Sequence, residues 1–335
     1  MAACSTTPRP DPTAVVIEPP RPPAPELTWR SAPFAFDEFD EPASMAVRPG
    51  DPALYVALTR KGTIWLSNDG LNWREGGRLE FTTNLLSERT VHEVVFSDGR
   101  FVAVGSETPP DEWASGLMWT SADGTAWSLR RLGHLVVRAL SAEGTLLAGA
   151  AVEEGGGFAE YDGAGWSMSQ PTNLVQWGMG EPEDLLPIES GFLIAGGLTR
   201  PGTDISVANV FTFDGDREWR WLTNESPTGP PIRNLARLGD GFAALGDDDT
   251  FWTATAVDRW SAPSELPFAA SRLFQGPDGT LLLMGEGIWA SVNGIHWTRT
   301  DDGSAPTGQW AYAGGAAIGC DDTACRAFVL EEPSE

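Results

Sequence analysis

One seven-residue phrase decides the fold of this chain: Ser67-Asn-Asp69-Gly70-Leu-Asn-Trp73. It returns as Ser121-Ala-Asp123-Gly124-Thr-Ala-Trp127 and as Ser291-Val-Asn293-Gly294-Ile-His-Trp297. Weaker copies near Tyr161, Phe213 and Thr255 bring the spacing to about forty to fifty residues. A period of that size indicates repeated supersecondary units, so the phrase predicts the architecture before it says anything about activity.

The repeat containing the second copy shows what each unit builds. Its apolar, strand-forming runs are residues 92–99, 101–105, 116–121 and 127–131. Short runs of β-branched and aromatic residues between Gly, Asp and Asn clusters are typical of strands joined by hairpins. Four antiparallel strands per repeat make one blade of a β-propeller, and the recurrent phrase falls in the turn between the third and fourth strands.

The number of blades follows from counting the repeats. Six full repeats begin near Met45, His92, Val137, Glu183, Arg233 and Ser271. The remainder, 313–330, holds two strands without the turn-and-Trp half, and residues 27–31 resemble the missing outer strand. We therefore predict an all-β, seven-bladed β-propeller of four-stranded antiparallel blades, whose last blade is closed by N- and C-terminal strands. A six-bladed ring with an irregular extra segment is the alternative.

The phrase resembles the Asp-box (BNR) repeat of sialidase-like β-propellers, in a shortened form in which Gly follows Asp directly. The resemblance covers about residues 45–298. It implies turn-forming roles without catalysis for Ser67, Asp69, Trp73, Ser121, Asp123, Trp127, Ser291 and Trp297. Proteins with Asp boxes differ widely in activity, so the resemblance leaves the function open.

The charge of the chain limits its partners. The formal net charge is -25 at pH 7. A surface of this sign repels phosphate backbones and anionic bilayers, so nucleic acid is not an expected partner. We expect one β-propeller domain over residues 26–331, a tail at 332–335, and a monomer that is soluble outside the cell.

The first residues indicate a subcellular location. Met1-Ala-Ala-Cys4 resembles the end of a bacterial lipobox, in which the cysteine is lipidated, and a Pro-rich run follows up to residue 25. We expect Cys4 to carry a lipid, residues 1–25 to be a disordered tether, and the protein to be extracytoplasmic, anchored to a bacterial membrane of the cell envelope. An incidental free cysteine near a disordered terminus is the alternative.

The other two cysteines, Cys320 and Cys325, flank a predicted hairpin turn in the closing blade. Four intervening residues in a hairpin bring the two Cα atoms within disulfide range. A disulfide there indicates an oxidising compartment. A metal or redox pair is the alternative, but the spacing and the lack of a third ligand disfavour zinc. No metal or cofactor is expected.

A binding site is expected where the first strands of the blades begin, around one mouth of the central channel. Alignment of the repeats places Glu93, Arg138, Asp184, Arg233 or Asn234, and Arg272 there. Arginines could clasp a carboxylate or phosphate in bidentate fashion. The alternative is that these charges neutralise one another in a channel-lining network.

Three tryptophans fall outside the repeat pattern: Trp113, Trp177 and Trp310. Aromatic residues in loops on a rigid scaffold are candidates for protein or glycan contacts. With 15 tryptophans in the chain, packing between blades is the alternative for each.

The sequence favours a non-catalytic propeller that binds a protein or glycan at the cell surface, because no recognisable catalytic set is present. The family's first-arginine motif, Arg-Ile-Pro, is absent, and there is no nucleophile elbow. The alternative is a sialidase-like or other glycoside hydrolase that would use Glu93 and Asp184 as its carboxylates.

Overall fold

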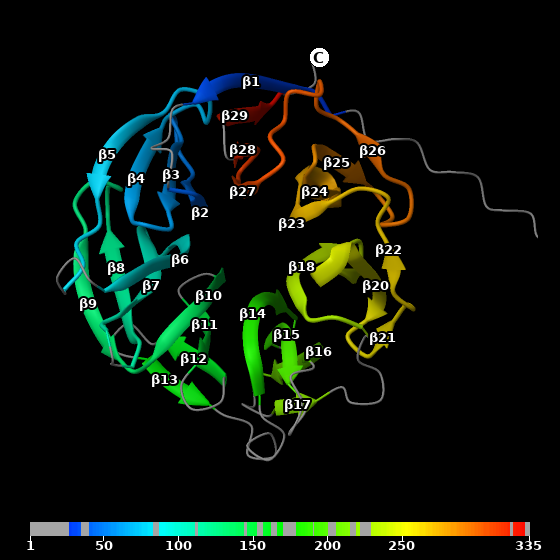
Figure 1. Ribbon diagram of the computed structural model, residues 1–335, viewed down its shortest axis with the longest axis horizontal. Coiled ribbons are helices and arrows are strands. Elements are labelled where there is room, and N and C mark those ends of the chain that lie inside the picture. The colour runs from blue at the N-terminus through cyan, green and yellow to red at the C-terminus, as the bar shows by residue number, and fades with distance from the viewer. Residues whose placement is uncertain are drawn as a thin grey trace, which may run out of the picture.

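The computed structural model describes residues 27–34, 40–82, 87–110, 113–143, 146–152, 157–161, 166–169, 179–189, 191–199, 206–214, 219–221, 229–321 and 324–331. These residues form a ring of antiparallel sheets around a central channel (Figure 1). The tether at 1–25, with Cys4, lies outside the described residues, as do Trp177 and the tail at 332–335.

The prediction of a seven-bladed ring is wrong: six blades are each built of consecutive strands from one repeat, and one further sheet combines strands from both chain ends. Blade 1 contains β2 (Pro42–Arg48), β3 (Leu54–Thr59), β4 (Thr63–Ser67) and β5 (Arg74–Arg78). Blade 2 contains β6 (Glu88–Ser97), β7 (Arg100–Thr108), β8 (Ser115–Ser121) and β9 (Ser128–Gly133). Blade 3 contains β10 (Val136–Glu143), β11 (Leu146–Val152), β12 (Gly157–Tyr161) and β13 (Trp166–Ser169).

The second half of the ring repeats this plan. Blade 4 contains β14 (Met179–Ile188), β15 (Gly191–Thr199), β16 (Ser206–Asp214) and β17 (Trp219–Trp221). Blade 5 contains β18 (Ile232–Leu238), β19 (Gly241–Gly246), β20 (Thr250–Ala256) and β21 (Arg259–Trp260), and blade 6 contains β23 (Ala270–Gln275), β24 (Leu281–Gly285), β25 (Ile288–Ser291) and β26 (Thr298–Arg299). Two 3-10 turns, η1 (Asp247–Asp249) and η2 (Pro277–Gly279), connect strands within blades 5 and 6.

The remaining sheet is a composite of both chain ends, here called the closing sheet. Its order is β1 (Trp29–Phe34), β29 (Cys325–Leu330), β28 (Ala316–Cys320) and β27 (Gln309–Ala313). Trp29 pairs with Leu330 and Phe34 with Cys325, so the N-terminal strand joins the sheet that contains Cys320. The innermost strands β2, β6, β10, β14, β18, β23 and β27 contact one another in sequence around the ring.

Blade 5 keeps the predicted four-stranded order, β18-β19-β20-β21, and carries one short addition. The extra strand β22 (Ser264–Glu265) pairs with β20 outside this order. Because β21 covers only the end of β20, through Ala254 and Ala256, the other end of β20 remains open to pairing. Glu265 and Ser264 occupy that end, opposite Thr250 and Phe251.

The recurrent phrase folds into the same turn wherever it occurs in full. In blade 1, Ser67 Oγ accepts hydrogen bonds from the N–H groups of Asp69 (3.2 Å) and Gly70 (2.9 Å). Asp69 Oδ1 accepts from the N–H groups of Leu71 and Asn72, at 3.0 and 2.8 Å. Burial opposes ionisation of Asp69, but these N–H donors prevail and lower its pKa to about 2.

Two features of each turn require a glycine: a positive φ angle and the close approach of the neighbouring blade. Gly70, Gly124 and Gly294 have φ of 71, 78 and 70°, where a side chain strains the backbone. A Cβ on Gly70 would also lie 2.6 Å from Ala316 Cβ of the closing sheet, and one on Gly124 would lie 2.8 Å from Val56 Cγ2 of blade 1. Each turn therefore docks on the preceding blade, which fixes the angle between neighbours.

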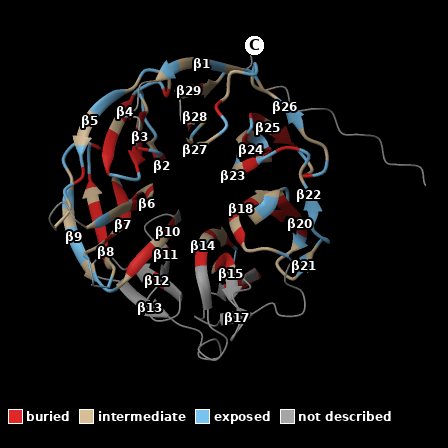
Figure 2. Cartoon of the chain, in the orientation of Figure 1, coloured by how far each residue is buried: buried red, intermediate tan, exposed pale blue. Residues whose placement is uncertain are grey.

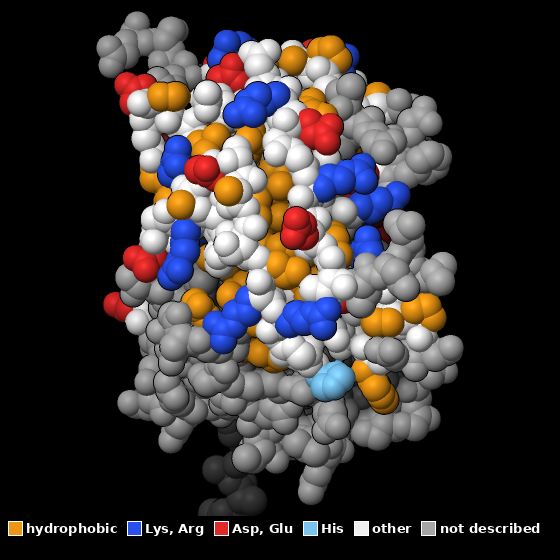
Figure 3. Space-filling view, turned by 90° about the vertical axis from the view of Figure 1, so that its left-hand side faces the viewer, with side chains coloured by type: hydrophobic (Ala, Val, Ile, Leu, Met, Phe, Trp, Pro, Cys, Tyr) orange, Lys and Arg blue, Asp and Glu red, His pale blue; other side chains and the backbone are white. Residues whose placement is uncertain are grey.

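The hydrophobic core lies in the seams between blades. Between blades 1 and 2 it includes Val56, Leu66, Phe101 and Trp119, with Trp127 of the second turn packed against it. Figure 2 shows buried residues in the inner strands and exposed residues along the outer strands. Figure 3 shows Lys and Arg side chains scattered among acidic ones over one side of the ring. Arg74 of the outer strand β5 is exposed.

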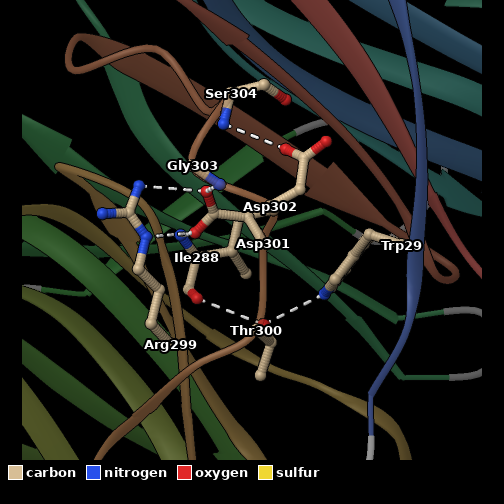
Figure 4. Close-up of polar contacts among 8 residues, drawn as sticks. All are labelled: Trp29, Ile288, Arg299, Thr300, Asp301, Asp302, Gly303 and Ser304. Carbon is tan, nitrogen blue, oxygen red and sulfur yellow. Dashed lines mark hydrogen bonds and ion pairs between the residues drawn. The ribbon is translucent and has the colours of Figure 1, made fainter.

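The seam between blade 6 and the closing sheet is held by polar contacts (Figure 4). Trp29 Nε1 donates to Thr300 Oγ1 at 3.1 Å, and Thr300 Oγ1 donates to Ile288 O at 3.1 Å. The Asp301 carboxylate, whose side chain is fully buried, accepts from Ile288 N (2.9 Å) and forms a two-point ion pair with Arg299. Both carboxylate oxygens of Asp301 are thus occupied by donors of the protein itself.

The closing sheet also contains the disulfide between Cys320 and Cys325. Its S–S distance is 2.05 Å and the two Cα atoms are 4.1 Å apart. The two residues are register partners of β28 and β29, so the bond spans the hairpin at the side of the ring where β27 begins. Among the described residues, no helix is long and apolar enough to cross a membrane.

Candidate functional site in the central channel

The inner strands of all six contiguous blades share a β-bulge at the same place. Register shifts leave one residue of each unpaired, and these residues are Ala43, His92, Arg138, Glu183, Arg233 and Ser271. A bulge re-aims the side chains that follow it. The residues directly after the bulge are Ser44, Glu93, Ala139, Asp184, Asn234 and Arg272.

Three of these post-bulge side chains accept a hydrogen bond from the main chain of the next blade. Leu140 N–H donates to Glu93 Oε2. Leu235 N–H donates to Asp184 Oδ2 at 2.7 Å, and Leu273 N–H approaches Asn234 Oδ1 at 3.4 Å. The leucine that donates its N–H group is in every case the residue after the post-bulge position of its own strand, so the same contact recurs from blade to blade.

Blade 3 offers no such acceptor, and Asp184 makes a second hydrogen bond in its place. The post-bulge residue of blade 3 is Ala139, which offers no acceptor to blade 4. The N–H group of Leu185 is bound instead by Asp184 Oδ1 of the same strand, at 2.8 Å. Asp184 therefore accepts two main-chain hydrogen bonds, one in blade 4 and one in blade 5.

These strands enclose a cavity of about 500 Å³ that runs along the channel. The charged and imidazole side chains that line it are Arg60, His92, Glu93, Arg138, Glu183, Asp184 and Arg272. The structure thus brings together Glu93, Asp184, Arg138 and Arg272, as the repeats predicted, and adds Arg60 and His92, which the sequence analysis did not select.

Arg233 does not belong to this group. Its side chain turns back on its own blade, where Nε pairs with Asp247 Oδ1 at 3.1 Å and Nη2 donates to Gly246 O at 2.8 Å. Asn234 lines the cavity in its place. Of the two alternatives that the repeats left open, Asn234 lines the cavity and Arg233 does not.

Of the tryptophans predicted to contact a ligand, one is buried and one is exposed among the described residues. Trp310 belongs to β27 and is 1% exposed, so its prediction as an exposed loop residue is wrong. Its ring packs against Phe328 in the closing sheet, with centroids 5.5 Å apart. Trp113, between β7 and β8, is 84% exposed.

The two channel carboxyl groups have raised pKa values. Burial, and then the charge of Asp184, raises the pKa of Glu93 from 4.5 to about 8, against the Leu140 hydrogen bond and the charge of Arg272. Burial raises the pKa of Asp184 from 3.8 to about 6, although the Leu235 and Leu185 N–H groups lower it. Both residues line the cavity, and their carboxyl groups are buried.

Glu93 should therefore make stability depend on pH. A carboxyl group with a raised pKa in the folded state contributes stability that is fully present below about pH 4.5 and lost as the pH rises through about 8. Glu93→Gln keeps a side-chain oxygen as acceptor for Leu140 N–H and removes the ionisation. We expect the melting temperature of this variant to fall less between pH 5 and pH 8 than that of the wild type. Equal slopes in differential scanning calorimetry would contradict the assignment.

The described residues contain no group of three or more His, Cys, Asp and Glu side chains placed to hold a metal ion. The acidic turn Asp247–Asp249 is occupied by its own protein contacts. Asp247 pairs with Arg233, and Asp249 Oδ1 accepts from Ala270 N at 2.8 Å. These carboxylates connect blade 5 to blade 6.

Comparison with known proteins defines the fold. No family profile and no curated protein matches the sequence. Among solved structures, YCF48 bound to D1 peptide has a TM-score of 0.61 and 16% identity, over 92% of this chain and 100% of that one. YCF48 from Cyanidioschyzon merolae has a TM-score of 0.55 and 13% identity, over 90% of this chain and 99% of that one.

A further match is the WD40 β-propeller domain of Doa1, with a TM-score of 0.53 and 13% identity, over 91% of this chain and 98% of that one. All three identities are low, so these likenesses show the architecture alone. The chain is a β-propeller of four-stranded antiparallel blades, and its function must be argued from its own residues.

Proposed function

We propose that this protein is a non-catalytic binding propeller that takes a protein partner at the channel. The observation that carries the proposal is the shared role of Glu93, Asp184 and Asn234. All three accept a main-chain hydrogen bond from the next blade at the same position of the repeat. An asparagine makes the same contact as the two carboxyl groups do. Glu93 and Asp184 therefore have a structural role in joining the blades, and no catalytic role is needed to explain them.

The binding surface is proposed to be the mouth face, defined as the side of the ring where the first strands begin. Strand β6 begins at Glu88, opposite Thr108 at the end of β7, so the segment with Trp113 emerges on this face. Arg60, in the turn between β3 and β4, lies on the same face and lines the cavity. An exposed tryptophan on the face that carries a charged cavity suits a protein contact. The neighbour YCF48, solved with a bound peptide, gives a precedent for peptide binding on this architecture.

The alternative is a glycoside hydrolase that acts at the channel. It is favoured by one observation, namely that the pKa of Glu93 lies near 8 while that of Asp184 lies near 6. A protonated acid beside a more acidic carboxyl group is the arrangement that glycosidases use. A screen of the purified protein with fluorogenic glycosides tests this. Turnover that disappears in both Glu93→Gln and Asp184→Asn would replace the binding proposal.

The binding proposal predicts a face-specific loss of partner capture. Trp113→Ala should reduce recovery of the partner from envelope extracts at least about tenfold, because truncating a central aromatic contact costs about 2 kcal/mol or more. The matched control is Ile295→Ala. Ile295 is 71% exposed but lies in a third-to-fourth strand turn on the opposite face. Equal recovery by the two variants would contradict the assignment of the mouth face.

We further propose an Asp-box relationship and an address in the cell envelope. Support for the first comes from the Ser and Asp or Asn hydrogen bonds of the turns at Ser67, Ser121 and Ser291. Support for the second comes from the Cys320–Cys325 disulfide, which suits an oxidising compartment. Acylation of Cys4 is tested by labelling the expressed chain with a radioactive fatty acid. Incorporation that persists in Cys4→Ser would refute the anchor.

A further inference from the structure

Two of the three arginines that line the channel cavity, Arg60 and Arg138, lie together with His92 where blades 1, 2 and 3 meet. Val91 N–H of β6 donates to the carbonyl of Arg60 at 2.8 Å, which fixes Arg60 of blade 1 beside His92 of blade 2. Arg138 is the bulge residue of β10, the next inner strand, as His92 is of β6. All three side chains line the same cavity.

This cluster is unusual for a chain of net charge -25. The other charged side chains in the cavity are Glu93 of β6, Glu183 and Asp184 of β14, and Arg272 of β23. Glu93 is mostly protonated at neutral pH, since its pKa lies near 8. Near pH 7 three arginines then line the cavity together with Glu183 and Asp184, while Glu41 pairs with Arg60 at its edge.

We infer that Arg60, His92 and Arg138 form an oxyanion subsite for a carboxylate or phosphate group of the bound partner. This deepens the proposed function and rests on it. Arginine side chains suit both groups because the guanidinium donates two parallel hydrogen bonds to them. The ion pair of Arg60 with Glu41, 3.3 Å from Nε to Oε2, is solvent-exposed and therefore weak enough to be exchanged for a ligand.

His92 gives the subsite a chemical signature. Its Nε2 lies 3.1 Å from Ser106 Oγ of β7. Burial, then the charges of Arg138 and Arg60, lower the pKa of His92 to about 4, so the imidazole is neutral at physiological pH. An anion bound between the arginines would offset their charge and favour the imidazolium. Binding of the anion and uptake of a proton by His92 are therefore coupled, and affinity rises as the pH falls.

The test uses sulfate and trifluoroacetate as probes, because neither changes its charge between about pH 4 and pH 8. Sulfate represents a phosphate source and trifluoroacetate a carboxylate source. The imidazole resonances of the full chain are followed by NMR across this range, with chloride at matched ionic strength as reference. His92→Gln assigns the signal among the three histidines. We expect at least one probe to raise the pKa of His92 by about one unit or more.

The variants locate the subsite. Arg60→Gln and Arg138→Gln should each weaken binding of the active probe about tenfold, while Arg138→Lys should retain part of it. Arg74→Gln, which changes an exposed arginine of β5 on the outer side, should have no effect. His92→Gln should keep the affinity at pH 7 and lose the part of its rise below pH 6 that depends on histidine.

Two results would overturn the inference. One is a pKa of His92 that is the same in sulfate, trifluoroacetate and chloride. The other is an affinity in Arg138→Gln no lower than in Arg74→Gln. Failure of the proposed function is a separate outcome, since loss of partner capture in Trp113→Ala does not involve the probes. If Arg138→Gln captures the partner as well as the wild type does, the proposed binding function stands, but the oxyanion subsite takes no part in it.

Discussion

A chain that begins at residue 35 should fail to fold into a stable ring, whereas a chain that begins at residue 27 should behave like the wild type. The longer form keeps β1, whose six residues pair with β29 from Trp29↔Leu330 to Phe34↔Cys325. Without β1 the edge of β29 is exposed, and an unprotected edge invites aggregation. The comparison therefore isolates one strand.

The expected effect is large because β1 holds both neighbours of the closing sheet. Trp29 packs among residues of blade 6 and donates to Thr300. At the other end, the Phe34 ring meets Trp65 of blade 1 edge-on, with centroids 4.6 Å apart. Loss of a six-residue pairing and two aromatic seams costs several kcal/mol, a large part of the ~5–15 kcal/mol that stabilises a typical protein.

Size-exclusion chromatography and thermal unfolding measure the result. A form beginning at residue 35 that stays monomeric and melts within a few degrees of the longer form would show that β1 is dispensable. Trp29→Phe serves as a graded variant, because it keeps most of the ring contacts and removes only the hydrogen bond to Thr300. Its expected cost is about 1 kcal/mol.

Asp184→Ala should be the most destabilising single substitution among the post-bulge positions. It removes the acceptor of both Leu185 N–H and Leu235 N–H. Each buried donor left without an acceptor costs about 1–3 kcal/mol, so the expected loss is about 2–5 kcal/mol. Asp184→Asn keeps one side-chain oxygen and should lose roughly half as much.

The matched comparison is Asn234→Ala at the equivalent position of blade 5. Asn234 accepts a longer hydrogen bond, 3.4 Å from Leu273 N, and its side chain also hydrogen-bonds Asp184, so its loss should cost about 1–2 kcal/mol. Urea unfolding of the three variants gives the ranking. If Asp184→Ala costs no more than Asn234→Ala, the side chains at this position do not hold the blades together.

The repeat turns were predictable because their chemistry is local. Ser67, Asp69 and Gly70 satisfy one another within four residues, and the required positive φ of the glycine is visible in the sequence. The same holds for Trp260 in blade 5, a weak copy whose Nε1 still donates to a carbonyl three residues earlier, that of Val257. Local rules therefore predicted the turns and, through them, most of the blades.

The channel was predictable only in part because its side chains depend on contacts between blades. Arg233 occupies the same bulge position as His92 and Arg138, but the nearby Asp247 and Gly246 carbonyl draw it away. Arg60 lies in a turn of blade 1, and its carbonyl accepts a hydrogen bond from Val91 N–H of blade 2. This contact between blades holds Arg60 at the channel. His92 could have been predicted as a channel residue, because it occupies the same position of its repeat as Arg138.

Trp310 was misplaced for a different reason. The closing sheet has no copy of the recurrent phrase to mark its strands, so the beginning of β27 resembled a loop. Its tryptophan is instead buried among Ile288, Ala317 and Phe328. The recurrent phrase that identifies each repeat in the sequence is missing from the closing sheet.

The composite closing sheet also constrains when this protein can fold. Trp29 is among the first described residues to leave the ribosome, yet its partner Leu330 is among the last. No ring can close until nearly the whole chain has been made, and pairing across such a sequence separation is slow. The blades built from single repeats can form earlier, but the N-terminal strand must stay unpaired throughout synthesis.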